Sequence, residues 1–400
     1  MSLKVADRAR VPHFEVMNVL QRVADMRAAG RDVISLCAGE PSAGAPSAVS
    51  AKAAEIHRLA LPLTYTSALG VRDLREAIAG HYRRWYGLEI TDDDVAVTTG
   101  SSGAFMLAFL AAFNPGDRVA LARPGYPAYR NILTAVGCEV VEIDCGPGER
   151  YQPNPALLDA AAEAHGKLSG LVLASPANPT GTMVSRTELA ALTDWCRTNS
   201  VRLVSDEIYH GITYTDPQAP DAKGVCAWEL DQTGVVISSF SKYWGMTGWR
   251  LGWALMPRDL APAMDALAGN VALCPPTPAQ LAAVEAFRPE SYAEADAAVA
   301  EFAGIRQVLL DNLGRLEWGT AAPADGAFYL YADLGDQLAG FADSAEYCRA
   351  LLEDEGVALV PGSDFDAVNG RRSVRLSFAA GKDAVAEAVE RIVRFQERRR

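Results

Sequence analysis

Short apolar runs separated by segments with helical patterning dominate the middle of this sequence. They cover residues 95–99, 118–122, 139–143, 170–175, 201–205, 235–239 and 251–255. Between two of them, Ser185-Arg186-Thr187-Glu188 is a capping box, which predicts a helix from there to about Thr198. Strands that alternate with helices favour a mostly parallel sheet covered on both faces. We therefore expect an α/β fold with a mostly parallel seven-stranded sheet flanked by helices, and a ligand site at the carboxyl ends of the strands.

A lysine stands just after one of these predicted strands. Lys242 follows the run Val235-Val236-Ile237 and lies between serine hydroxyls and Arg250. Partial burial favours the neutral amine, which is the nucleophilic form. An amine able to form a Schiff base, beside hydroxyl and guanidinium groups suited to a phosphate, is what pyridoxal phosphate requires. The structural alternative is a lysine whose stem covers the end of a core strand.

Two more polar residues follow predicted strands in the same way. Asp206 comes after the run 201–204, where a carboxylate can keep a pyridine nitrogen protonated. Asn178 lies in the proline-rich loop Ala174–Gly181, after another apolar run. A helix cap or turn explains Asp206 equally well, and a plain turn explains the loop of Asn178. The ends of parallel strands meet at one edge of a sheet, so Lys242, Asp206 and Asn178 are expected to lie together.

These motifs resemble those of the fold type I pyridoxal-phosphate-dependent aminotransferases, the aspartate aminotransferase family, over nearly the whole chain. Asn-Pro-Thr-Gly at 178–181, Asp-Glu-Ile-Tyr at 206–209 and Ser-Phe-Ser-Lys at 239–242 occur in order, followed by Gly-Trp-Arg at 248–250. The resemblance implies that Lys242 is the catalytic Schiff-base lysine and Asp206 the partner of the pyridine nitrogen. It also implies that Asn178 and Tyr209 donate to the ring hydroxyl, with Tyr209 counted among the catalytic residues, and that Ser239 and Arg250 bind the phosphate.

The turn Gly100-Ser101-Ser102-Gly103, between a predicted strand and a predicted helix over 104–110, supplies further expected cofactor ligands. Free backbone N–H groups at such a helix start favour an anion, so Ser101 and Ser102 are candidate phosphate ligands. A serine helix cap is the structural alternative, and the two roles are compatible. By resemblance, Tyr126 stacks on the cofactor ring, although an aromatic residue packed in ordinary core is the alternative.

Three further residues are assigned by resemblance. Tyr65 is similar to the tyrosine that reaches the phosphate bound by the partner subunit, which implies a homodimer with shared active sites. Arg375, in the alternating segment 373–379, matches the arginine that binds the substrate α-carboxylate through two parallel hydrogen bonds. An exposed strand arginine is the alternative reading of Arg375. Gly39 resembles the glycine whose backbone faces the same carboxylate, and Asn178 is expected to contribute to substrate binding as well.

Composition narrows the class of protein. The chain has 37 basic and 50 acidic residues, a net charge of −13, which argues against a nucleic-acid partner. No apolar run approaches a membrane span and no signal-peptide core is present, so we expect no membrane partner. Seven cysteines without paired spacing favour free thiols in the cytoplasm. No HExxH or similar zinc pattern occurs, and we expect no catalytic metal.

The chain is long enough for two domains. We expect residues 46–287 to form the large cofactor-binding domain. Residues 1–45 and 288–400, the two ends of the chain, are expected to form a smaller α/β domain with strands at 328–331 and 373–379.

The expected reaction is a two-stage transfer of an amino group from an amino acid to a 2-oxo acid, by a ping-pong mechanism. Aspartate enzymes of the most similar subgroup carry a lysine where this sequence has Ser102. The segments 11–17 and 271–275, expected to line the side-chain pocket, are largely apolar and lack lysine and arginine. This pattern resembles enzymes for neutral amino acids of the alanine or valine–pyruvate type.

Several alternatives remain open. An aspartate aminotransferase and a pyridoxal-phosphate-dependent carbon–sulfur β-lyase share almost all of the cofactor residues. Ser239 and Lys242 also fit the Ser-x-x-Lys pattern of serine acyl enzymes, but no Ser-Asp-Asn or Lys-Thr-Gly motif accompanies them. A regulator built on this fold would need a DNA-binding extension, for which the chain has no room.

Overall fold

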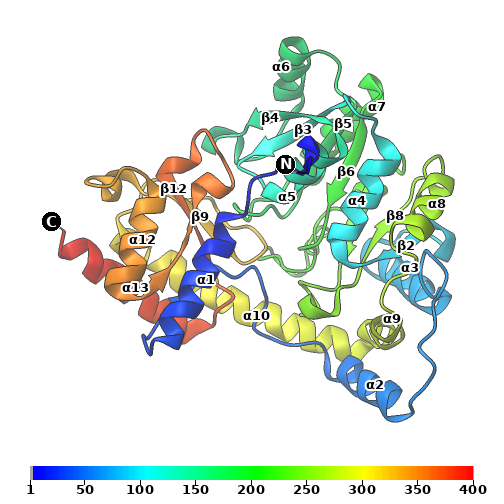
Figure 1. Cartoon of the computed structure of the whole chain (residues 1–400), viewed down its shortest axis with the longest axis horizontal. Helices are drawn as coiled ribbons and strands as arrows, with labels where there is room; N and C mark the ends of the chain where they lie inside the picture. Colours follow the sequence, from blue (N-terminus) through cyan, green and yellow to red (C-terminus); the bar gives the residue numbers. More distant parts are fainter. Residues whose placement is uncertain (1–2, 400) are drawn as a thin grey trace.

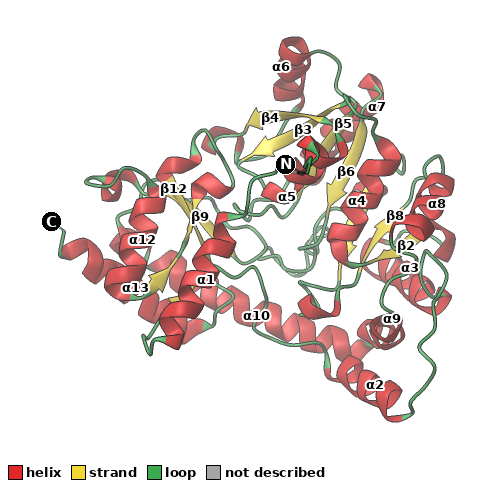
Figure 2. Cartoon of the chain, viewed as in Figure 1, coloured by secondary structure: helices red, strands yellow, loops and turns green. Residues whose placement is uncertain are grey.

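A seven-stranded sheet lies at the centre of the computed structural model, which describes residues 3–399 (Figures 1 and 2). The strand order is β2-β8-β7-β6-β5-β3-β4. Only β8 runs antiparallel to its neighbours, so the expected mostly parallel sheet is confirmed. The strands are β2 (Val95–Thr98), β3 (Arg118–Arg123), β4 (Glu139–Asp144), β5 (Gly170–Ala174), β6 (Arg202–Asp206), β7 (Val235–Ser239) and β8 (Gly252–Leu255).

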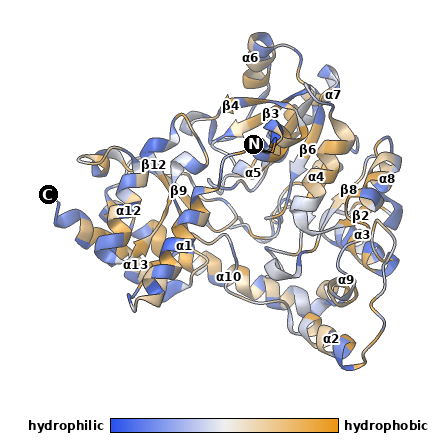
Figure 3. Ribbon diagram, in the orientation of Figure 1, coloured by the Kyte–Doolittle hydropathy of each residue, from blue (hydrophilic) through white to orange (hydrophobic). Residues whose placement is uncertain are grey.

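Both faces of this sheet are buried, which explains why its strands read as continuous apolar runs. Along β7, Val235 and Ile237 join one core cluster, whereas Val236 between them joins the other. Figure 3 shows the strands as largely apolar and the outer helices as mixed. The flanking helices are α3 (Arg72–Tyr86), α4 (Gly100–Ala112), α5 (Pro127–Val136), α6 (Pro155–His165), α7 (Arg186–Asn199) and α8 (Ala261–Val271).

Two smaller sheets lie beside the main one and combine both ends of the chain. Strand β1 (Ile34–Ser35) pairs in parallel with β10 (Val357–Ala358). Strands β11 (Val360–Pro361), β12 (Ser373–Ser377) and β9 (Tyr329–Asp333) form an antiparallel sheet. Arg22 of α1 (Glu15–Ala28) pairs with Glu353 of α12 (Ser344–Glu355), and α12 contacts α13 (Lys382–Glu397). Figure 1 shows α10 (Pro289–Asp311) running from this part toward the main sheet. The remaining helices are α2 (Ser47–Arg58), α9 (Thr277–Ala283) and the short α11 (Leu313–Leu316).

Element boundaries agree closely with the sequence pattern, with one informative difference. The capping box of α7 is present: Glu188 N donates to Ser185 Oγ at 3.3 Å, and Ser185 N donates to Glu188 Oε2 at 2.7 Å. Helix α4 begins at Gly100, four residues before the predicted start, and its N-cap residue is Thr99 rather than a serine. The predicted turn is therefore the first turn of the helix. Within residues 3–399, no helix combines the length and apolar character needed to cross a bilayer.

Candidate active site

The candidate site lies where three neighbouring parallel strands end. Asn178 follows β5, Asp206 is the last residue of β6, and Lys242 follows β7. Asp206 and Asn178 are buried, whereas Lys242 is partly accessible. The structure thus brings together the three residues that the strand pattern placed at one edge of the sheet.

Lys242 carries an amine that burial pushes toward its neutral form. Its Nζ donates to the backbone carbonyl of Gly39 at 2.5 Å and lies 5.8 Å from the ring centre of Tyr209. Burial lowers the pKa of Lys242 to about 8, although the nearby carboxylate of Glu40 acts in the opposite direction. A lysine with that pKa is partly neutral near pH 7, as a nucleophile or proton acceptor requires.

Asp206 is a buried carboxylate held by two donors. It accepts hydrogen bonds from the hydroxyl of Tyr129 and from the backbone N–H of Ile208, the latter at 3.1 Å. Burial raises the pKa of Asp206 to about 6, while these hydrogen bonds and Lys242 favour the ionised form. At neutral pH, Asp206 is therefore mainly an anion facing the site.

The first turn of α4 packs against β8 and Arg250. A Cβ atom added to Gly252 would lie 2.6 Å from Ser101 N, and one added to Gly100 would lie 2.5 Å from Arg250 Nη2. Only glycine permits these approaches, which bring backbone N–H groups and a guanidinium to one place. Ser239 is nearby on β7, where its Oγ contacts Ser241 Oγ at 2.9 Å. A helix start, hydroxyls and an arginine together fit a phosphate.

Arg375, on β12, is buried with its guanidinium beside Asn178. Its Nη1 donates to Asn178 Oδ1 at 3.0 Å and its Nη2 donates to the carbonyl of Cys37 at 2.6 Å, while Nε has no partner. The rings of Tyr329 and Phe365 lie 4.5 and 4.7 Å from the guanidinium carbon. Among residues 3–399, no carboxylate accepts a hydrogen bond from this buried guanidinium and its Nε–H is unpaired, so Arg375 is suited to bind an anionic ligand.

Tyr209 and Gly39 meet at Tyr329. The hydroxyls of Tyr209 and Tyr329 are 2.8 Å apart, and a Cβ atom on Gly39 would lie 2.6 Å from the hydroxyl oxygen of Tyr329. Gly39 therefore allows the backbone that faces Lys242 to approach Tyr329. This contact brings together the N-terminal segment with Gly39, the start of β9 with Tyr329, and the loop after β6 with Tyr209.

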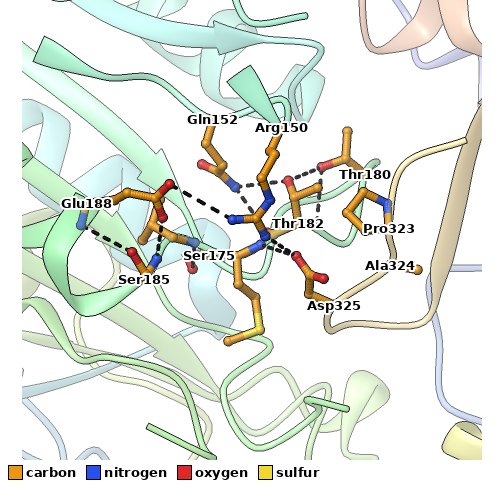
Figure 4. Close-up of polar contacts among 12 residues, drawn as sticks. Arg150, Gln152, Ser175, Thr180, Thr182, Ser185, Glu188, Pro323, Ala324 and Asp325 are labelled. Atoms are coloured by element: carbon orange, nitrogen blue, oxygen red, sulfur yellow. Dashed lines mark hydrogen bonds and ion pairs between the residues drawn. The ribbon is translucent and has the colours of Figure 1, made fainter. Parts of the chain in front are cut away.

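The loop of Asn178 is fixed by side chains from outside the motif (Figure 4). Gln152 Nε2 donates to Ala174 O at 3.2 Å and to Thr182 O at 3.0 Å, and so joins the two ends of the loop. Arg150 extends between Glu188 and Asp325, with Nη2 donating to Asp325 Oδ2 at 2.7 Å. This framework holds the amide of Asn178 against Arg375.

Other predicted residues lie at the edge of the site or outside it. Tyr126 is partly buried, with its ring parallel to that of Phe14 at a centroid distance of 6.1 Å. Ser102 is exposed in the first turn of α4. Tyr65 is 78% exposed and faces solvent in this single chain, so the structure does not bring it to this chain's cluster.

Sequence reasoning missed the residues that hold the predicted ones. Tyr129 binds Asp206, Gln152 binds the Asn178 loop, and Tyr329 and Phe365 cover Arg375. Of these, Tyr129 had a detectable signal, because it occurs three residues after Tyr126 in the same predicted segment. The others are distant in the sequence from the motifs they support.

Comparisons with known proteins identify the family and the fold. The family model of aminotransferase class I and II matches residues 31–392. A valine–pyruvate aminotransferase of Mycobacterium tuberculosis (strain ATCC 25618 / H37Rv) is 51% identical over 98% of each chain. A crystal structure of an aminotransferase from Mycobacterium tuberculosis superposes with a TM-score of 0.94 at 50% identity, covering 99% of this chain and 100% of that one.

A further solved structure is less similar in sequence but also matches nearly the whole chain. It is the aspartate aminotransferase from Thermus thermophilus with maleate, which has a TM-score of 0.89 at 30% identity and covers 98% of this chain and 100% of its own. The family model over most of the chain and these matches, together with the lysine and carboxylate at neighbouring strand ends and the buried arginine of β12, show that the chain belongs to the class I and II aminotransferases of fold type I.

Proposed function

We propose that this aminotransferase binds pyridoxal phosphate at the candidate site and takes the amino group from a neutral amino acid of the valine or alanine type. Transfer of an amino group from an amino acid to a 2-oxo acid is the activity of its family relatives. The observation that carries the proposal is the buried guanidinium of Arg375, which binds Asn178 and leaves Nε unpaired near Lys242.

The residues present fit pyridoxal phosphate. Arg250, Ser239 and the first turn of α4, with Ser101 and Ser102, would hold the phosphate, since glycines at 100 and 252 bring these groups close together. Asp206 would pair with the pyridine nitrogen, Asn178 and Tyr209 would bind the ring hydroxyl, and Tyr126 would stack on the ring. Lys242 would hold the cofactor covalently. When bound, the cofactor supplies an electron sink for the donor α-carbon.

Each residue then has a separate task in the reaction. Arg375 and the backbone at Gly39 bind the donor α-carboxylate and orient its α-carbon toward Lys242. Once the donor amine has taken the place of Lys242, the freed neutral Nζ would accept the α-proton and later return it, so a lowered pKa favours the acceptor form. Asp206 remains ionised and would stabilise the positive charge on the pyridine nitrogen.

Neutral donors are favoured by the groups near Tyr126. The ring of Phe14 lies parallel to Tyr126, and the position of the lysine found in aspartate enzymes is occupied by Ser102. The similar protein from Mycobacterium tuberculosis is named for valine and pyruvate. An aspartate aminotransferase is the alternative, supported by relatives such as the enzyme of Geobacillus stearothermophilus at 32% identity. A carbon–sulfur β-lyase is the second alternative, because the cofactor residues are shared.

A homodimer with shared sites accompanies this proposal. Tyr65 lies in a segment with the exposed apolar residues Leu61 and Leu63. Thr277 Oγ1 donates to Thr64 O at 2.8 Å, which ties this segment to the region after Val271 and Leu273, also exposed. An apolar surface of this kind favours a second copy of the chain, and Tyr65 would then reach the phosphate of the partner subunit.

Domain division and location complete the proposal. Residues 46–287 would form the large domain, and residues 1–45 with 288–400 the small one, since the small sheets combine both chain ends. All seven cysteines lie within the described residues and are free thiols. Free thiols are typical of the reducing cytoplasm, which is the location that we propose.

The test combines spectroscopy with a donor screen. Protein reconstituted with pyridoxal phosphate is expected to show a visible absorbance band that disappears on reduction with borohydride. Valine, alanine, leucine and aspartate are then compared as donors to pyruvate and 2-oxoglutarate. A tenfold preference for aspartate over valine would refute the neutral donor class, and release of pyruvate and a thiol from cysteine conjugates in place of amino transfer would favour the lyase.

A further inference from the structure

Phe14 forms an aromatic wall beside the candidate site. Its ring is nearly parallel to that of Tyr126, with an interplanar angle of 8° and centroids 6.1 Å apart. Tyr126 in turn meets Tyr129, the residue that binds Asp206, at 5.4 Å between centroids. An apolar ring at this position is suited to contact the side chain of a neutral donor.

The position of Phe14 depends on how helix α1 begins. Phe14 is the N-cap residue of α1, and a phenylalanine side chain has no acceptor for the free N–H groups of the first turn. Asp364, 349 residues away, accepts Glu15 N at Oδ1 (3.1 Å) and Val16 N at Oδ2 (3.4 Å). The carboxylate of Asp364 thus caps α1 in place of a side chain at the N-cap position.

Asp364 itself is fixed relative to Tyr126. The carbonyl of the next residue, Phe365, accepts Gly125 N at 3.0 Å, directly before Tyr126 in the chain. Asp366 then pairs with Arg123 at 3.2 Å, and both side chains are largely buried. The segment 364–366 therefore holds α1 on one side and the backbone of Tyr126 on the other.

We propose that Asp364 is a positioning residue for donor selectivity. By capping α1 it holds the ring of Phe14 parallel to that of Tyr126, where Phe14 can contact the side chain of the donor. This inference rests on the proposed aminotransferase function, since it identifies what discriminates between donors at that site. Asp364 accepts backbone N–H groups at the start of α1, and in this proposal its effect on the donor passes through that helix start.

The experiment compares Asp364→Ala, Phe14→Ala and the double variant with the native holoenzyme. The readouts are kcat/KM for alanine, 2-aminobutyrate, valine and leucine with pyruvate, and amide hydrogen exchange over residues 14–18. Asp343→Ala is the matched control, because Asp343 Oδ1 caps α12 through two backbone N–H groups at 3.1 and 3.0 Å. Both aspartate variants lose a helix cap, but only Asp364 accepts backbone N–H groups of α1, the helix that begins directly after Phe14.

Losing the cap should favour a frayed helix start by about 2- to 30-fold, which raises exchange in the first turn of α1. A hydrophobic pocket discriminates by about 10- to 200-fold per methylene, so losing part of the wall should reduce the preference for valine over alanine by about 5- to 10-fold. Phe14→Ala should reduce it similarly, and the double variant should add little to either change. Asp343→Ala should leave both readouts unchanged: the hydrogen exchange over residues 14–18 and the preference for valine over alanine.

Unchanged donor ratios in Asp364→Ala, full additivity in the double variant, or an equal ratio change in Asp343→Ala would each overturn the inference. Failure of the proposed function has a different signature. In that case the native protein shows no borohydride-sensitive band and no transfer from any neutral donor, and unchanged hydrogen exchange over residues 14–18 in Asp364→Ala would still refute the capping role.

Discussion

Replacing Arg375 with lysine tests the carboxylate site most directly. The native guanidinium donates to Asn178 Oδ1 and to Cys37 O, keeps Nε unpaired, and lies between the rings of Tyr329 and Phe365. A lysine retains the charge but offers a single ammonium in place of a planar fork. The variant is therefore expected to lose one of two parallel hydrogen bonds to the donor carboxylate.

The size of the loss follows from these contacts. A charge-assisted hydrogen bond contributes about 1.5 to 3 kcal/mol. Its loss corresponds to a decrease in kcat/KM of about 10- to 150-fold. The contacts of the guanidinium with the rings of Tyr329 and Phe365 exist without a donor and do not enter this difference. This decrease should appear only for donors that carry an α-carboxylate.

The assay therefore pairs valine with isobutylamine, which has the same skeleton without the carboxylate. In the native enzyme, isobutylamine should be a much poorer donor than valine. In Arg375→Lys, kcat/KM for valine should fall by the predicted factor while the value for isobutylamine stays within about twofold, because the amine never used the lost bond.

Arg372→Lys is the matched control for this experiment. Arg372 precedes β12, pairs with Asp333 at 3.2 Å near the surface, and has a side chain that is 60% exposed. It should alter neither donor. An equal loss for valine and isobutylamine in Arg375→Lys would indicate general damage to the site, and an unchanged value for valine would remove Arg375 from its proposed role.

Three further predictions concern residues around the same site. Lys242→Ala should lower turnover by at least about 100-fold. In the cofactor-free native protein, covalent uptake of pyridoxal phosphate should accelerate as pH rises through about 8, because the neutral amine of Lys242 reacts. An uptake rate independent of pH between 6 and 9 would contradict this. Asp206→Asn should slow the amino-transfer step in single turnover far more than it weakens donor binding, since it removes the charge opposite the ring nitrogen, and an unchanged step would refute the assignment. Gln152→Met should lower the free energy of unfolding by about 1 to 3 kcal/mol, since the carbonyl of Ala174 loses the amide as a partner while that of Thr182 still accepts Ala177 N. In urea titrations, a change below about 0.5 kcal/mol would show that water replaces the amide.

Much of the fold could be predicted because the decisive information is local. The apolar runs at 170–174 and 235–239 are continuous since both sheet faces are covered, and the capping box at Ser185 and Glu188 is complete within four residues. The same strand pattern placed Lys242, Asp206 and Asn178 after the ends of strands. Alternation of strands and helices dictates a parallel sheet, and a parallel sheet brings those ends together.

Tertiary structure alone decided which side chains support the site. Tyr129 binds Asp206 across 77 residues, Arg375 binds Cys37 O across 338, and Asp364 caps α1 across 349. No local pattern marks Asp364, because its partners are backbone N–H groups that any residue would offer. Such contacts are specified only when folding brings distant backbone segments within hydrogen-bonding distance, whereas strand, helix and turn preferences act between residues adjacent in the chain.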